Sequence, residues 1–211
     1  MVRLCRFLVG VEVLILTLLL LPSSTTALAQ PANVPINHII VIYLENHSFD
    51  NLYGEFPGAN GLEQPGAQLP QVDKSGMLYH SLPQPLDSSK EPPSPDQRFP
   101  AALLTNAPFP IERYVPLEQP IPDLVHRFYQ HQLQMDGGRM DRFVAWTDAG
   151  GLPMGYYDTK QLPLYPYARS YTLTDNFFHA AFGGSFLNHM WLVCACTPVW
   201  PDAPDDSVPP G

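Results

Sequence analysis

The stretch that decides the fold is residues 36–61, which read INHIIVIYLENHSFDNLYGEFPGANG. Its first part, residues 38–44, is a nearly continuous apolar run that is rich in β-branched side chains. Such a run is typical of a central strand that is buried on both faces of a parallel sheet. The sequence therefore predicts an α/β fold in which this strand is central.

Oxygen-bearing side chains follow the predicted strand directly. Glu45 and Asn46 would lie at its carboxyl end, where open α/β sheets bind their ligands. A carboxylate beside an amide carbonyl offers hard oxygen donors to a divalent cation. Ser48 and Asp50 suit the first turn of a following helix, because their side-chain oxygens can accept from free backbone N–H groups.

A second stretch with the same organisation covers residues 170–197, with a strand-like run, a glycine turn and an apolar helix. Gly183 and Gly184 let the backbone approach a ligand closely, and Ser185 would begin the helix. A hydroxyl at a helix start lies beside free N–H groups that attract anions. Ser185 could then be a nucleophile, or simply a cap for an apolar helix over residues 186–196.

Taken together, these stretches resemble the bacterial phosphoesterase family of phospholipases C and a secreted acid phosphatase, within the alkaline-phosphatase-like superfamily. The family signature is roughly Glu-Asn-Arg-Ser-Phe-Asp, then a Gly and a Pro-Gly; His47 stands where the family usually has Arg. Residues 137–144, 154–157 and 183–189 match further family stretches in the expected order. The residues that match the first signature are Glu45, Asn46, Ser48, Phe49, Asp50, Gly54, Pro57 and Gly58.

The resemblance implies a partial alkaline-phosphatase-like sandwich, with a largely parallel central sheet flanked by helices and the carboxyl-terminal half missing. Family members are usually much longer than this chain. The superfamily completes its metal site with an Asp pair from that half. Asp205 and Asp206 are adjacent, but they lie in a Pro-rich tail with no preceding strand, so we interpret them as unrelated.

The resemblance also assigns roles to residues of the two stretches. Glu45, Asn46 and Ser185 would hold a divalent metal ion, and Ser185 would attack phosphorus to form a phosphoserine that water hydrolyses. Asn188 would bind the phosphoryl oxygens. His189 would either donate a proton or pack against its helix, and His126 would either bind substrate or be structural.

The substrate class follows from the form of the second stretch. Residues 183–189 read GGSFLNH, which resembles the acid-phosphatase branch and favours hydrolysis of phosphate monoesters. Phospholipase C-type cleavage of phosphodiesters is the alternative within enzymes, and a truncated, inactive remnant is the alternative outside them. The expected partner is a small phosphate ester or a phospholipid head group. The net charge of −9 provides no basic stripe for nucleic acid.

The ends of the chain predict export. Residues 1–29 have the features of a secretory signal: Arg3 and Arg6, an apolar segment, and a small-residue cleavage site at Ala29. The uninterrupted apolar part, residues 13–21, is shorter than the ~20 residues of a spanning helix. We therefore expect a secreted or periplasmic protein with no stable membrane span after cleavage; a retained anchor is the alternative. Residues 200–211 read as an irregular tail.

The middle of the predicted catalytic portion, residues 30–211, is dominated by a Pro-rich excursion over residues 61–122. We expect it to be mostly ordered rather than a disordered linker, because apolar residues can anchor it on a core. A helix with Asp123 as its N-cap should follow and end at Gly137. The anchors are Phe99, Leu103, Leu104, Phe109, Tyr114 and Val115.

The cysteines that remain after removal of the signal are Cys194 and Cys196, separated by one residue. Near neighbours rarely reach disulfide geometry, and a helix would point the two side chains in different directions. We expect buried free thiols on a core helix, with a strained or intermolecular disulfide as the alternative.

Overall fold

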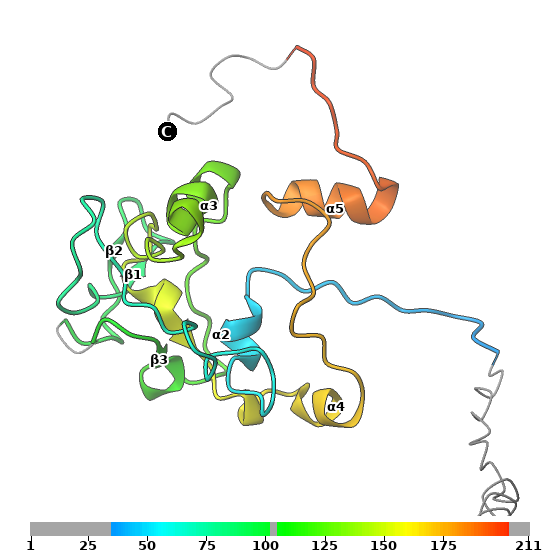
Figure 1. Cartoon of the computed structure of the whole chain (residues 1–211), viewed down its shortest axis with the longest axis horizontal. Helices are drawn as coiled ribbons and strands as arrows, with labels where there is room; N and C mark the ends of the chain where they lie inside the picture. Colours follow the sequence, from blue (N-terminus) through cyan, green and yellow to red (C-terminus); the bar gives the residue numbers. More distant parts are fainter. Residues whose placement is uncertain (1–34, 102–104, 203–211) are drawn as a thin grey trace, which may run out of the picture. The chain divides into compact units, whose positions relative to one another are not determined.

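The computed structural model describes residues 35–101 and 105–202. The chain divides into two units, residues 1–42 and 43–211, and every helix and strand below lies in the second (Figure 1). The predicted signal over residues 1–29 and the tail after residue 202 lie outside the described residues. Within the described ranges, no helix has the length and apolar character needed to cross a membrane.

The strands are short and form two separate pairs. β1 (Leu86–Asp87) is antiparallel to β2 (Ser94–Pro95), and β3 (Phe109–Pro110) is parallel to β4 (Gly155–Tyr156). In the second pair, Phe109 lies opposite Gly155. The fold is mixed α/β, as predicted, and its parallel pairing is limited to β3 and β4.

Among the described residues there are also four α-helices and several turns of 3-10 helix (Figure 1). The α-helices are α2 (Phe49–Tyr53), α3 (Phe128–Met135), α4 (Tyr165–Ser170) and α5 (Ser185–Cys194). Helix α2 precedes the strands, α3 lies between β3 and β4, and α4 and α5 follow β4. The 3-10 turns are Ile111–Arg113, Asp136–Gly138, Leu152–Met154 and Thr159–Gln161.

The Pro-rich stretch supplies half of the hydrophobic core cluster. Phe99, Phe109 and Val115 are buried there, and Tyr114 packs against them, while Leu103 and Leu104 lie outside the described residues. Burial of such side chains supplies the favourable term that opposes the conformational entropy of ordering the chain. The core cluster comprises Leu82, Phe99, Phe109, Ile111, Val115, Val144, Ala149, Leu152, Tyr157 and Leu162.

A close backbone approach at β4 depends on a glycine. A Cβ on Gly155 would lie 2.6 Å from Cγ1 of Ile111, a fully buried core residue. The absence of a side chain therefore allows β4 to pass directly over Ile111 and to pair with β3. This contact fixes the position of the following residues, Tyr156 and Tyr157.

The predicted strand over residues 38–44 is wrong for this structure. These residues have no strand conformation, and Ile39 and Ile40 are 82% and 86% exposed. A strand is stable only when neighbouring strands satisfy its backbone N–H and C=O groups, and no described residue pairs with this run. The apolar pattern predicted a buried environment that the described residues do not provide.

The predicted start of the helix after the Pro-rich stretch is also wrong. α3 begins at Phe128, with Arg127 in place of Asp123 as the N-cap. The residues before it are held in another way, because the backbone N–H of Val125 donates to the Asp148 carboxylate at 3.0 Å. The Asp148 carboxylate thus accepts from the Val125 N–H, which in the predicted helix would have lain in the first turn.

The two cysteines form a disulfide, which corrects the expectation of buried free thiols. Cys194 is the last residue of α5, and Ala195 has a left-handed backbone with φ of 51°. This residue reverses the chain direction, so that the side chain of Cys196 meets that of Cys194. Both cysteines are exposed.

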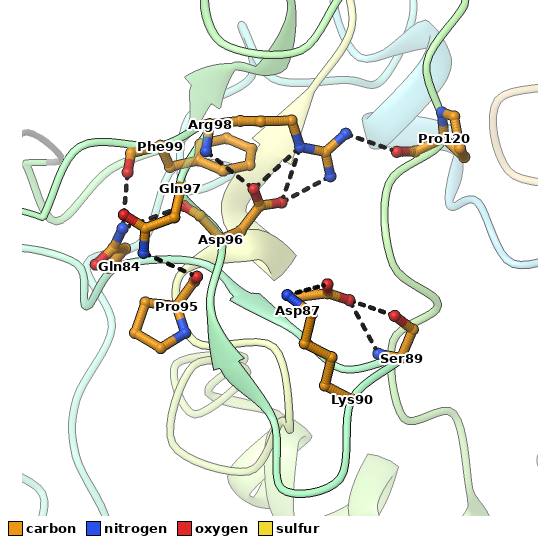
Figure 2. A network of polar contacts seen from close by, with 10 residues as sticks. All are labelled: Gln84, Asp87, Ser89, Lys90, Pro95, Asp96, Gln97, Arg98, Phe99 and Pro120. Atoms are coloured by element: carbon orange, nitrogen blue, oxygen red, sulfur yellow. Dashed lines mark hydrogen bonds and ion pairs between the residues drawn. The ribbon is translucent and has the colours of Figure 1, made fainter.

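An ion pair between Asp96 and Arg98 stabilises the Pro-rich stretch (Figure 2). Asp96 is 7% exposed, and Arg98 donates to it from Nε at 3.0 Å and from a terminal nitrogen at 2.7 Å. The other terminal nitrogen of Arg98 donates to the Pro120 carbonyl at 2.9 Å. The Arg98 side chain holds the pKa of the Asp96 carboxyl below its usual value.

We expect Arg98→Ala to lower the free energy of unfolding by about 2–3 kcal/mol, because the Asp96 carboxylate loses charged hydrogen bonds in a buried place. The depressed folded pKa means that this stabilisation is complete above the unfolded Asp value of about 3.9 and is lost as pH falls through the folded value. Urea unfolding at neutral and acidic pH measures both effects. Arg169→Ala, at an exposed position, is the control; equal stability curves for Arg98→Ala and wild type would contradict the account.

Candidate functional site

The first predicted site residues lie at a turn that leads into α2. The side chain of Ser48 caps this helix and accepts from the Asn51 backbone N–H at 3.1 Å, as predicted. Asn46 has φ of 72°, a left-handed conformation that asparagine tolerates better than most residues. Glu45 and Asn46 are therefore carried on a sharp turn, and both are exposed.

Asn51 ties this turn to β4. Its side-chain amide donates to the Gly155 carbonyl at 2.8 Å, and its own carbonyl accepts from the Tyr157 N–H at 2.8 Å. His47 joins the contact, since its Nδ1 is 2.6 Å from the Asn51 side-chain oxygen and its ring lies edge-on to Tyr157. The first signature and the stretch at residues 154–157 thus meet in space.

A pocket of about 910 Å³ opens beside this turn. Asn46 and His126 line it, whereas Glu45, Ser185, Asn188 and His189 do not. Its polar lining also includes His47, Asp50, Asp123 and His131, and most of the remaining lining is apolar. The pocket brings the first signature together with the segment before α3.

Two of the three histidines that line the pocket, His126 and His131, are in different environments. His126 has its Nδ1 2.6 Å from the Leu124 carbonyl, which can only accept, so Nδ1 donates and Nε2 of the neutral ring is free to accept. Burial, and next the nearby His126, lower the pKa of His131. His131 also stacks edge-on against Phe182, in the segment before α5.

Ser185 is the first residue of α5, as predicted, and Gly184 occupies the N-cap position. The role of a simple cap is therefore taken by Gly184. A Cβ at Gly184 would lie 3.2 Å from the His126 carbonyl oxygen, so this glycine packs closely on the His126 backbone. The segment that carries Ser185 thereby lies next to one that lines the pocket.

Asn188 is 7% exposed and uses its side chain within the turn before α5. Its oxygen accepts from the Ala181 N–H at 3.3 Å, and its nitrogen donates to the Gly184 carbonyl at 3.3 Å. These bonds fix the glycine turn that precedes Ser185. The structure shows this contact, and the predicted bond to phosphoryl oxygens stays a prediction.

We expect Asn188→Ala to lower the free energy of unfolding by about 1 kcal/mol, because the partly buried Ala181 N–H loses its side-chain acceptor and the Gly184 carbonyl loses one of its donors. Hydrogen exchange of the Ala181 amide should become faster while exchange in α2 is unchanged. Phe186→Ala, at a 71% exposed position on the same helix, is the control. Unchanged exchange at Ala181 would show that the turn does not depend on Asn188.

His189 lies along the first turn of α5. Its Nδ1 is 2.9 Å from the Ser185 carbonyl, so Nδ1 donates and Nε2 of the neutral ring is the free nitrogen. The ring packs edge-on against Tyr43, with ring centres 4.9 Å apart. His189 thus packs on its helix, one of its two predicted roles, and retains a nitrogen for proton transfer.

Two residues near the site were not predicted from the sequence. Tyr43 precedes Glu45 by two residues, and its hydroxyl is 2.9 Å from Nδ1 of His179. Partial burial, and next the charge of Glu45, raise the pKa of the Tyr43 phenol, which keeps it protonated at neutral pH. A hydroxyl within an otherwise apolar run was the available signal for Tyr43; His179 carried none.

The predicted metal ligands carry oxygen donors. Glu45, Asn46 and Ser185 offer a carboxylate, an amide carbonyl and a hydroxyl, the hard oxygen donors that suit Mg²⁺, Ca²⁺ or Mn²⁺. Among the residues that the structure describes, no group of three or more His, Cys, Asp or Glu is arranged to hold a metal ion. By the chemistry of their oxygen donors the three side chains suit such an ion, and their role as its ligands stays a prediction.

The chain is similar in sequence to known phospholipases C. The chain is similar to phospholipase C A of Mycobacterium tuberculosis (strain ATCC 25618 / H37Rv), with 28% identity over 83% of this chain and 32% of that protein. It is also similar to non-hemolytic phospholipase C of Burkholderia pseudomallei (strain K96243), with 29% identity over 73% of this chain and 20% of that protein.

The chain thus spans at most about a third of the length of these relatives. No solved structure matches it significantly. The sequence profile of the phosphoesterase family matches residues 36–207, a range that includes both the Glu45–Asn46 turn and the start of α5. The chain belongs to the phosphoesterase family.

Proposed function

We propose that the protein hydrolyses phosphoric esters through a phosphoserine formed on Ser185. The observation that carries the proposal is the position of Ser185 as the first residue of α5, after a glycine N-cap. The free N–H groups of a first helical turn stabilise negative charge, and a phosphoryl group that is being transferred carries such charge. The family match at both stretches supports the same chemistry.

The proposed roles follow from the chemistry of each side chain. The Ser185 hydroxyl attacks phosphorus; as the new P–O bond forms, the bond from phosphorus to the ester oxygen breaks, the serine proton passes to solvent, and the leaving oxygen takes up a proton. Glu45, Asn46 and Ser185 would hold a divalent metal ion, which when bound favours the serine alkoxide and withdraws charge from phosphoryl oxygens. Asn188 orients the turn before Ser185 and is a candidate donor to the phosphoryl oxygens.

Two histidines are candidates for proton transfer and substrate binding. His189 has a free Nε2, because its Nδ1 is bonded to the Ser185 carbonyl, so it can protonate the leaving group. His126 lines the pocket with its Nε2 free, so it is the candidate to contact the substrate. Water then attacks the phosphoserine and releases phosphate.

The GGSFLNH form of residues 183–189 supports phosphate monoesters as the substrates of an acid-phosphatase type of enzyme. The names of the two relatives favour a second candidate, cleavage of phospholipids as by a phospholipase C. The substrate is accordingly a small phosphate ester or a phospholipid head group. We further propose that the protein acts outside the cytoplasm, either secreted or periplasmic, as the features of residues 1–29 predict.

The full chain, supplied with a chromogenic phosphate monoester or the matching diester and added Mg²⁺, Ca²⁺ or Mn²⁺, tests the proposal. We expect metal-dependent release of the chromophore from the monoester, faster than from the diester. Faster release from the diester would favour the phospholipase C type. A folded chain that hydrolyses neither ester under any metal would overturn the proposal and support the inactive remnant.

A further inference from the structure

We propose that Tyr43 is a positioning residue that holds the Glu45–Asn46 turn against the helix that carries Ser185; this role rests on the proposed function. Among residues 43–48, Tyr43 is the single residue that is partly buried, and the others are exposed. Its neighbours Ile42 and Leu44 are 77% and 70% exposed. Tyr43 is therefore the anchor of this segment.

The Tyr43 side chain contacts the second stretch at two points. Its hydroxyl shares a hydrogen bond of 2.9 Å with Nδ1 of His179, six residues before Ser185. Its ring packs on the imidazole of His189, with 4.9 Å between ring centres. The His189 imidazole is in turn bonded to the Ser185 carbonyl at 2.9 Å. The Tyr43 side chain thus connects the turn at Glu45 and Asn46 to the backbone of Ser185 through His189.

A second, independent connection joins the same two parts of the chain. The backbone N–H of Asn60 donates to the Asp175 carboxylate at 2.7 Å, and the Asn60 side chain donates to the Asn176 side-chain oxygen at 2.9 Å. The loop after α2 is therefore also attached to the segment before α5. Of the two connections, the one made by Tyr43 involves residues that are closer in sequence to Glu45 and Ser185.

The chemistry explains why such a link matters. A metal held by Glu45 and Asn46 can act on Ser185 only if the two are kept in a fixed relation, and a misplacement of about 1 Å can cost roughly 100-fold in rate. The Tyr43 phenol touches neither substrate nor metal in this scheme. Its effect is exerted through His179, His189 and the backbone of α5.

Three substitutions separate the two contacts. Tyr43→Phe keeps the ring on His189 and removes the hydrogen bond, Tyr43→Ala removes both, and His179→Ala removes the bond from the other side. Tyr171→Phe, at a 78% exposed tyrosine, is the control. We expect kcat to fall about 5-fold in Tyr43→Phe and His179→Ala, the equivalent of one net hydrogen bond, and about 100-fold in Tyr43→Ala. KM should not change.

A readout besides activity uses Mn²⁺ as a paramagnetic probe in amide NMR spectra. In the wild-type chain, Mn²⁺ should broaden the signals of Glu45 and Asn46 and also those of Ser185 and Asn188. In Tyr43→Ala it should broaden only the first pair, while Tyr171→Phe behaves as wild type.

The outcomes separate the two proposals. If the wild-type chain binds Mn²⁺ and turns over ester, but Tyr43→Ala leaves both broadening and kcat unchanged, the role of Tyr43 is overturned and the proposed function stands. If the wild-type chain shows neither broadening nor turnover, the proposed function fails and the role of Tyr43 fails with it. A loss of kcat in Tyr43→Ala that is fully explained by unfolding also overturns it; retention of activity in Tyr43→Phe above that in Tyr43→Ala supports it.

Discussion

Ser185→Ala is expected to reduce hydrolysis of a phosphate monoester by at least about 1000-fold, because loss of a nucleophile leaves only binding and electrostatic stabilisation. KM should change little, since the hydroxyl acts when the new P–O bond forms. The helix itself should persist: Gly184 is the N-cap, and alanine has the best helix propensity. Steady-state kinetics, with circular dichroism to verify the fold, make the measurement.

A matched control is available for this substitution. Ser170 is exposed at the end of α4, and Ser170→Ala should leave kcat unchanged. Ser185→Thr keeps a hydroxyl and should retain more activity than Ser185→Ala. Turnover in Ser185→Ala close to that of wild type would rule out Ser185 as the nucleophile and leave it as an ordinary residue of a first helical turn.

Glu45→Gln is expected to weaken binding of the divalent metal by at least about 100-fold, because even outer-shell partners of a metal contribute about 10- to 100-fold. The substitution keeps the shape of the side chain and removes its charge. Turnover at a fixed metal concentration should fall in parallel, and excess metal should restore part of it. Calorimetric titration with Mn²⁺, followed by activity as a function of metal concentration, measures both effects.

Glu63→Gln is the control for charge, because Glu63 is exposed and follows the glycines of the loop after α2. It should titrate with Mn²⁺ as wild type does. Equal Mn²⁺ affinity in Glu45→Gln and wild type would exclude Glu45 as a ligand. A second substitution, Asn46→Ala, would then show whether the turn binds metal at all.

Local features of both stretches were predictable from the sequence. Ser48 caps α2 and Ser185 begins α5 because short-range rules govern helix starts, and these rules need only neighbouring residues. The apolar anchors of the Pro-rich stretch are likewise in the core at Phe99, Phe109 and Val115. Burial of large apolar side chains does not require knowledge of which element they meet.

Features that depend on partners far along the chain were not predictable. The run at residues 38–44 has the pattern of a buried strand, but its conformation is decided by whether neighbouring strands pair with it. The segment before α3 is bonded to Asp148, which lies beyond the helix in sequence. The contact between Tyr43 and His179 joins residues 136 positions apart, so no local pattern could reveal it.

The disulfide illustrates the same limit at short range. Spacing alone argued against a bond between Cys194 and Cys196, because a continuous helix would separate the side chains. The left-handed backbone at Ala195 ends the helix between them, and this conformation is rare for alanine. The backbone conformation of Ala195 therefore allows the disulfide between Cys194 and Cys196.

Trapping of the covalent intermediate tests the central claim most directly. The wild-type chain is mixed with a phosphate monoester and Mn²⁺, quenched in acid, digested and analysed by mass spectrometry. We predict a phosphoryl group on the peptide that contains Ser185, absent in Ser185→Ala and lost on dilution into water without substrate. Ester turnover with no phosphoryl group on that peptide would contradict a phosphoserine mechanism.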